Sequence, residues 1–155
     1  MKLSDLKKKY ENLAKKHNLP SFSELNVDFE IDKLDKNTES VLRSIRKLMM
    51  EKIVNSMSFL EMLLNPMNSP RMYMLFIRTM SVDDKKKIDD IYSALADLSL
   101  FSLNLEIDSE EKAEAELIKN TFEKWNSLKP LFRDIIQGIR VPKNFVAKKE
   151  RSYFG

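Results

Sequence analysis

The chain of 155 residues contains only two glycines, Gly138 and Gly155, and no cysteine. Glycine-rich turns bind phosphates and dinucleotides because they let backbone N–H groups approach the ligand, and cysteines supply thiolates and metal ligands. This shortage, together with a single histidine, excludes most enzyme templates that rest on short motifs. What remains are long stretches without glycine or proline, and these favour α-helix.

Composition is typical of one globular domain. Hydrophobic residues make up 43% of the chain and charged residues 33%, which excludes wholesale disorder. The longest apolar run, Met72–Ile77, has six residues, whereas a membrane-spanning helix needs about 20. Residues 1–17 carry six lysines and no apolar block, so we expect no secretory signal. With no cysteine present, we expect a cytoplasmic protein without a cofactor.

Positive charge is concentrated at the two ends. Residues 1–17 and residues 140–155 each sum to +4, while the net charge of the whole chain is only +3. The residues between the two ends are therefore mildly acidic. We expect a helical domain over residues 1–139 and a basic, aromatic tail over residues 140–155.

Apolar periodicity predicts an all-α fold, a bundle of four main helices with short accessory helices. The clearest helix is expected from about Asp35 to Leu64, a stretch without glycine or proline. Another begins after Ser81, because acidic residues in its first turn complement the helix dipole. Further helices are expected over residues 3–17 and after Asp108-Ser109.

Breaks and caps follow from local signals. In Asn26–Ile31 apolar and polar residues alternate, which favours an extended segment. Ser69-Pro70 predicts a helix cap followed by proline at the first helical position. Ser127 and Pro130 predict a break before a last short helix. Gly138 lies near the end of that helix, where glycine favours the left-handed cap conformation.

Eight of the nine methionines lie between Met49 and Met80. Methionine is flexible and polarizable, so a methionine-lined groove can adapt to varied apolar partners. The alternative is that these side chains fill irregular core space where a long helix turns back into a short one. Four methionines fall off the main apolar stripes and are candidate partner-binding residues: Met50, Met62, Met67 and Met74.

The tail interleaves basic and aromatic side chains. Phe145, Tyr153 and Phe154 are candidate partner-binding residues, because aromatic side chains can dock into a groove on another protein or on the chain's own bundle. Basic residues also neutralise phosphates and aromatic rings stack on unpaired bases, so a nucleic-acid-binding accessory protein is the alternative. Its candidate contacts are Arg140, Lys143, Lys148, Lys149 and Arg151.

An acidic cluster has the spacing of a magnesium-binding set on one helix face. It consists of Glu110, Glu111 and Glu114. It resembles the first half of the site in all-α nucleoside triphosphate pyrophosphatases, which implies a magnesium-dependent nucleotide pyrophosphatase as a second alternative. That family needs a second acidic pair about a helix later, where this chain has Glu123 with Asn126 and then Asp134 alone. We favour the interpretation that these acidic residues complement the dipole at a helix N-terminus, and we predict no metal site.

His17, the only histidine, has Ala14 three residues before it. It therefore lacks the Glu-x-x-His motif of di-iron bundles. No cysteine exists for it to activate. We expect His17 to lie at the surface or at the end of a helix.

The segment Leu19-Pro20-Ser21-Phe22, followed by Phe29-Glu30-Ile31 and a long helix, resembles small helical proteins of archaea that have no assigned role. The resemblance covers about the first third of the chain. It implies a helical fold and no activity, and it carries over no site. We therefore expect a non-enzymatic helical protein-interaction module or structural protein, with a second copy of the chain as one candidate partner.

Overall fold

Within residues 2–141, which the computed structural model describes, every regular element is a helix. The expected all-α fold is confirmed. None of these helices combines the length and apolarity of a membrane-spanning segment. The α-helices are α1 (Leu3–His17), α2 (Phe22–Phe29), α3 (Val41–Leu64), α4 (Met74–Thr79), α5 (Val82–Ile107) and α6 (Glu111–Arg140). Short 3-10 helices are η1 (Ile31–Lys33), η2 (Pro66–Asn68) and η3 (Arg71–Tyr73).

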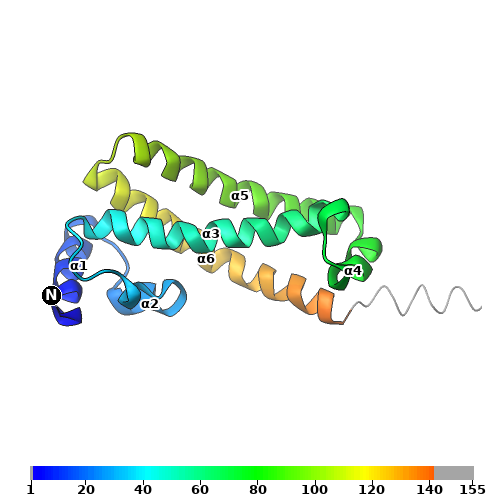
Figure 1. The fold of residues 1–155 in the computed structure, drawn as a ribbon, viewed down its shortest axis with the longest axis horizontal. Coiled ribbons are helices and arrows are strands. Elements are labelled where there is room, and N and C mark those ends of the chain that lie inside the picture. Colours follow the sequence, from blue (N-terminus) through cyan, green and yellow to red (C-terminus); the bar gives the residue numbers. More distant parts are fainter. Residues whose placement is uncertain (1, 142–155) are drawn as a thin grey trace, which may run out of the picture.

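The three longest helices, α3, α5 and α6, follow the long axis of the molecule, and each contacts the other two (Figure 1). Each presents apolar side chains at spacings of three and four residues to a common core. The buried core residues include Ile45, Met49, Ile53 and Leu60 of α3, Ile88, Ile91 and Leu95 of α5, and Leu117, Ile118 and Leu128 of α6.

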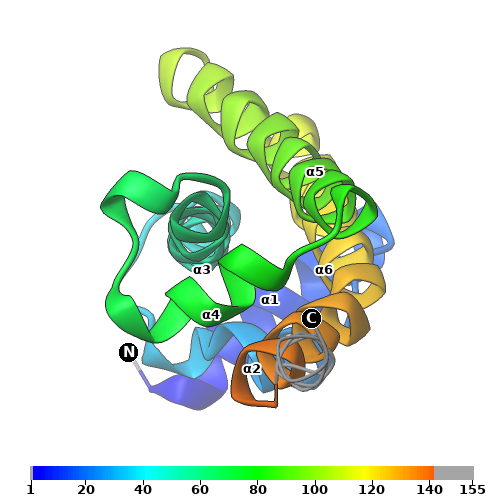
Figure 2. The ribbon, with the colours of Figure 1, turned by 90° about the vertical axis from the view of Figure 1, so that its right-hand side faces the viewer.

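The shorter helices cover the two ends of this body. At one end, α1 contacts α3 and α6, and α2 contacts α1 and α3. Tyr10 ties α1 to the next loop, because its buried hydroxyl donates to the carbonyl oxygen of Pro20 at 2.6 Å. At the other end the chain passes from α3 to α5 through α4, which contacts α6 (Figure 2).

The expectation of an extended segment over Asn26–Ile31 is wrong, because most of this stretch belongs to α2. A capping box starts the helix: the hydroxyl of Ser21 accepts from the N–H of Glu24, whose carboxylate accepts from the N–H of Ser21. The buried side chains Phe22 and Phe29 lie on one helical face. The capping box and the buried helical face therefore outweigh the alternation of apolar and polar residues that favoured an extended segment.

Helix α3 begins at Val41 rather than at about Asp35. The carboxylate of Asp35 accepts from the N–H of Asn37 at 2.9 Å, a local turn that competes with helix. At the other end, Ser69 does not cap a following helix. Its hydroxyl donates to the carbonyl oxygens of Met62 and Asn65, so it caps the end of α3. Pro70 precedes η3 rather than opening an α-helix.

Helix α6 also differs from expectation at both of its predicted boundaries. Its N-cap is Glu110, and Ser109 instead donates to Glu114 at 2.9 Å. No break occurs at Ser127 or Pro130, since the helix continues to Arg140. Pro130 lies on the exposed side, while side chains on both sides of it, among them Leu128 and Phe132, anchor the helix in the core. Packing thus outweighs one missing backbone hydrogen bond.

Gly138 lies inside α6 and has no positive φ, so its expected left-handed cap role is wrong. The requirement for glycine at this position is steric. A Cβ atom at this position would lie 2.9 Å from Cε2 of Phe76, a residue of α4. The missing side chain lets α4 lie close against α6.

We expect Gly138→Ala to lower the free energy of unfolding by about 1 kcal/mol, because overpacking against Phe76 outweighs the gain in helix propensity. The same substitution in a Phe76→Ala background should instead raise it by about 1 kcal/mol, since the clash is gone. Urea unfolding of the four proteins measures both effects. A stabilising Gly138→Ala in the unmodified background would contradict the steric explanation.

Candidate functional site

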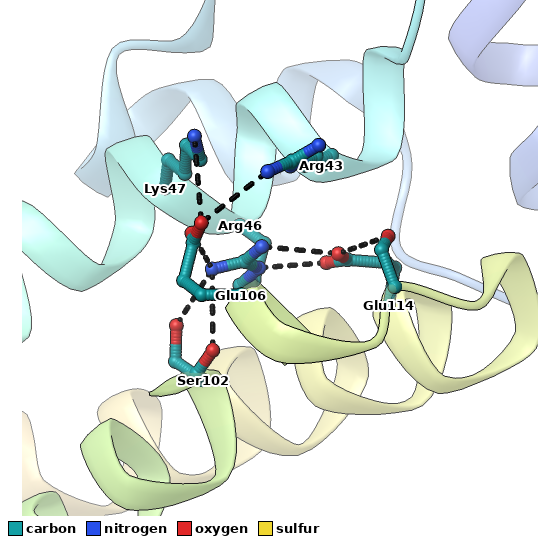
Figure 3. Close-up of polar contacts among 7 residues, drawn as sticks. Arg43, Arg46, Lys47, Ser102, Glu106 and Glu114 are labelled. Atoms are coloured by element: carbon teal, nitrogen blue, oxygen red, sulfur yellow. Dashed lines mark hydrogen bonds and ion pairs between the residues drawn. The ribbon is translucent and has the colours of Figure 1, made fainter. Parts of the chain in front are cut away.

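The most densely bonded polar group lies inside the body, around Arg46 of α3, whose side chain is 1% exposed (Figure 3). Nε and Nη2 of Arg46 donate to the two carboxylate oxygens of Glu114 in α6, at 2.7 and 3.0 Å. Nη1 donates to the hydroxyl of Ser102 at 2.9 Å and to Glu106 at 2.7 Å, both in α5. One guanidinium therefore connects the three long helices.

These contacts hold the charges in place. Burial alone would lower the pKa of Arg46, but its hydrogen bonds to Glu114 and Glu106 raise that pKa above its ordinary value. The hydrogen bond from Arg46 holds the pKa of the Glu106 carboxyl below its usual 4.5. Arg43 and Lys47 add further ion pairs to Glu106, at 3.3 and 3.7 Å. The cluster acts as an internal cross-link.

The acidic cluster considered as a magnesium site is divided among different partners. Both oxygens of Glu114 are bonded to Arg46, and the side chain is 2% exposed. Glu111 pairs with Lys16 at 2.8 Å and lies 3.3 Å from Nε2 of His17, which ends α1 as expected. Within residues 2–141, no three His, Asp or Glu side chains are grouped as metal ligands. The spacing of Glu111 and Glu114 therefore reflects ion pairs that hold α6 against α1 and α3.

Acid should weaken this cluster. The folded-state pKa of Glu106 is lowered, so the unfolded chain binds more protons, and stability falls as pH drops through the folded pKa. We expect Glu106→Gln to be less stable than the unmodified chain at neutral pH and the gap to narrow below about pH 4.5. Urea midpoints between about pH 3 and pH 7 measure this. A gap independent of pH would contradict it.

The four candidate methionines do not share one environment. Met50 is 8% exposed and belongs to the core, so the expectation that it offers free surface is wrong. It lies on the side of α3 that faces α5, where it lines a shallow hollow together with Ser102 and Leu103. Met74 is partly buried against the core. Met62 and Met67 remain exposed near the end of α3.

Most candidate residues of the tail lie outside the described residues. These are Phe145, Tyr153 and Phe154, and Lys143, Lys148, Lys149 and Arg151 of the nucleic-acid alternative. Arg140 is described, and it is exposed in the last turn of α6.

The C-terminal half of α5, a helix that runs along the upper edge of the molecule in Figure 1, carries exposed apolar side chains. We call Leu100, Leu103 and Ile107 the α5 face. Their exposed fractions are 61%, 58% and 86%, and they recur at spacings of three and four on one side of the helix. Phe101 is 45% exposed beside them, and Val54 of α3 lines one shallow hollow with Leu103. Clustered exposed apolar residues mark interaction surfaces.

The charged residues that precede and follow the α5 face along the chain are acidic. Between Lys87 and Lys112, every charged residue is Asp or Glu. Asp97 lies three residues before Leu100, the first residue of the face, and Asp108 and Glu110 follow Ile107, the last. None of the ion pairs formed within residues 2–141 includes these three carboxylates. The face thus combines an apolar centre with these unpaired carboxylates, whereas on the side toward α3 Lys47 lines the hollow next to Leu103.

Sequence reasoning missed the α5 face because it followed only the stripe that packs into the core. A second stripe on the other side of the same helix was visible in the spacing of Leu100, Leu103 and Ile107. Two apolar stripes on one helix indicate either a central helix or a helix with an external partner. Because α5 lies at the edge of the body, it is not a central helix.

A second hollow, of about 660 Å³, lies among α2, α3 and α6 and is lined by aromatic side chains, including Trp125. Two of the three basic side chains in its lining, Lys52 and Lys129, already have partners. The ammonium of Lys52 lies 5.8 Å from the ring centre of Phe29 and 5.2 Å from that of Trp125, and Lys129 pairs with Asp28 at 2.9 Å. These contacts fix α2 on the body.

No family model matches this chain, and neither a curated protein nor a solved structure matches it. The resemblance of the first third to archaeal helical proteins stays a prediction. Function has to be argued from the surfaces themselves.

Proposed function

We propose that this chain is a non-enzymatic protein-interaction module whose α5 face binds a cationic amphipathic helix of another protein. The supporting observation is the exposure of Leu100, Leu103 and Ile107 in one row, with acidic residues before and after it in the chain. In this proposal a bundle of four main helices, α1 with α3, α5 and α6, is the rigid support. Met62 and Met67, which are also exposed, remain candidate partner-binding residues in this proposal.

Apolar contact supplies the affinity in this proposal. Burying a Leu or Ile side chain contributes about 1.5–3 kcal/mol, so the α5 face and its neighbours contribute several kcal/mol. Part of this offsets the entropy lost on association. We therefore expect weak binding, with a dissociation constant between about millimolar and about micromolar.

Charge selects the partner. A second copy would place acidic residues against acidic residues when two α5 faces meet, and like charges at such distances are destabilising. A helix with lysine or arginine beside its apolar stripe would place opposite charges next to Asp97 and Asp108 instead. This favours a basic partner over self-association.

A designed peptide pair tests the proposal on the full chain. One peptide repeats heptads with leucine at the a and d positions and lysine elsewhere, and its matched control carries glutamate in place of lysine. Fluorescence anisotropy should show binding of the lysine peptide, weakened by salt, and no binding of the glutamate peptide. Equal binding of both peptides, or binding of neither, would contradict the proposal. Sedimentation equilibrium showing a stable dimer of the chain alone would make a second copy the partner.

A further inference from the structure

A separate hollow, of about 500 Å³, lies at the α4 end of the molecule, among α4, the first turns of α5 and the last turns of α6. Its walls are mainly apolar. An apolar cavity of about 150 Å³ already holds benzene, so this space admits an aromatic side chain. The lining includes Phe76, Met80, Ile88, Ile91, Leu131 and Ile135.

Gly138 forms part of the α6 wall. Because a Cβ atom there would lie 2.9 Å from Cε2 of Phe76, any larger side chain would take up space on this side of the hollow. The glycine thus keeps the wall free of side-chain atoms at the point where α4 and α6 come together.

The charged lining of the hollow is net negative. Asp84 and Asp134 contribute two carboxylates against the single ammonium of Lys87. Asp134 is exposed and takes part in none of the ion pairs formed within residues 2–141. An occupant that carries an aromatic ring next to a positive charge would match both properties of the site.

The chain itself carries such a segment at this point. Val141 lines the hollow and is followed by the fourteen residues 142–155, in which Lys143 precedes Phe145. Phe145 is four residues beyond Val141, so an extended chain can carry it at most about 14 Å. A tether this short gives a local concentration of the order of millimolar, so even a weak contact is populated.

We propose that this hollow is the docking site for Phe145 of the chain's own C-terminal segment, with Lys143 next to Asp134. The site is independent of the α5 face, which lies at the opposite end of the molecule in Figure 1. Docking covers apolar surface of the half-exposed Leu131 and the partly exposed Ile135, and it leaves the proposed partner surface free.

Nuclear Overhauser effects in the full chain test this directly. They require close contact, which a tether alone does not provide. We expect them between the ring protons of Phe145 and the methyl groups of Leu131 and Ile135, the accessible aliphatic side chains of the α6 wall. Leu131→Asp, a change at a half-exposed wall residue, should abolish them, whereas the matched Leu100→Asp on the α5 face should not.

Three results would overturn the proposal. The first is the absence of such effects from Phe145 in the unmodified chain, which needs no variant to fold. The second is their appearance only between differently labelled chains in a mixed sample, which would assign the site to a second copy. The third is their occurrence from Tyr153 or Phe154 in place of Phe145.

Discussion

Replacing Glu114 with Gln is expected to lower the free energy of unfolding by about 3–5 kcal/mol, because it removes one partner of a buried ion pair and leaves Arg46 without a full counter-charge. Both side chains are almost completely inaccessible, and the pair is bidentate. Urea denaturation followed by circular dichroism measures the loss.

Glu111→Gln is the matched control, since it removes the same charge three residues earlier in the same helix. Glu111 pairs with Lys16 at the surface, where solvent screens the interaction, and we expect little change. Replacing both partners, Arg46→Met with Glu114→Leu, should recover much of the stability lost in the single variant. Similar effects of Glu111→Gln and Glu114→Gln would show that the buried cluster does not cross-link the helices.

Leu103→Lys should reduce binding of the lysine peptide by about 30-fold or more, because a central apolar contact is worth at least about 2 kcal/mol and the added charge repels the cationic partner. Leu103 is 58% exposed, so its loss should leave the free energy of unfolding nearly unchanged. Anisotropy titration and urea denaturation of the same sample separate the two effects.

Val82→Lys is the matched control for surface charge. Val82 is 84% exposed in the same helix, but it lies in the first turn, away from the α5 face. We expect its effect on binding to be small. Comparable losses for Val82→Lys and Leu103→Lys would indicate a general electrostatic effect and would remove the α5 face as the contact.

Elements with strong local signals were predictable from the sequence. The capping box of Ser81 and Asp84 starts α5, and the core positions Ile88 and Leu95 follow from their spacing. The prediction failed where tertiary contacts decide. Pro130 indicates a helix end by its missing N–H, but core packing on both sides of it carries α6 through.

The buried cluster was harder to foresee because Arg46 lies 56 to 68 residues from its partners in the chain. Charged residues ordinarily face solvent, so nothing local assigns Arg46 to the interior. One indication was available: Arg46 lies between Leu42 and Met49 in the apolar stripe of α3, and Glu114 precedes Ile118 in that of α6. Opposite charges within two apolar stripes predict a buried pair.

The most direct test of the proposed function is a methyl NMR titration of the full chain with the lysine peptide. We expect the methyl signals of Leu100, Leu103 and Ile107 to shift with peptide concentration, while those of core residues such as Leu95 stay in place. The shifts should diminish as salt is added. Shifts confined to other surfaces, or none at peptide concentrations up to about millimolar, would contradict the assignment of α5 as the partner-binding face.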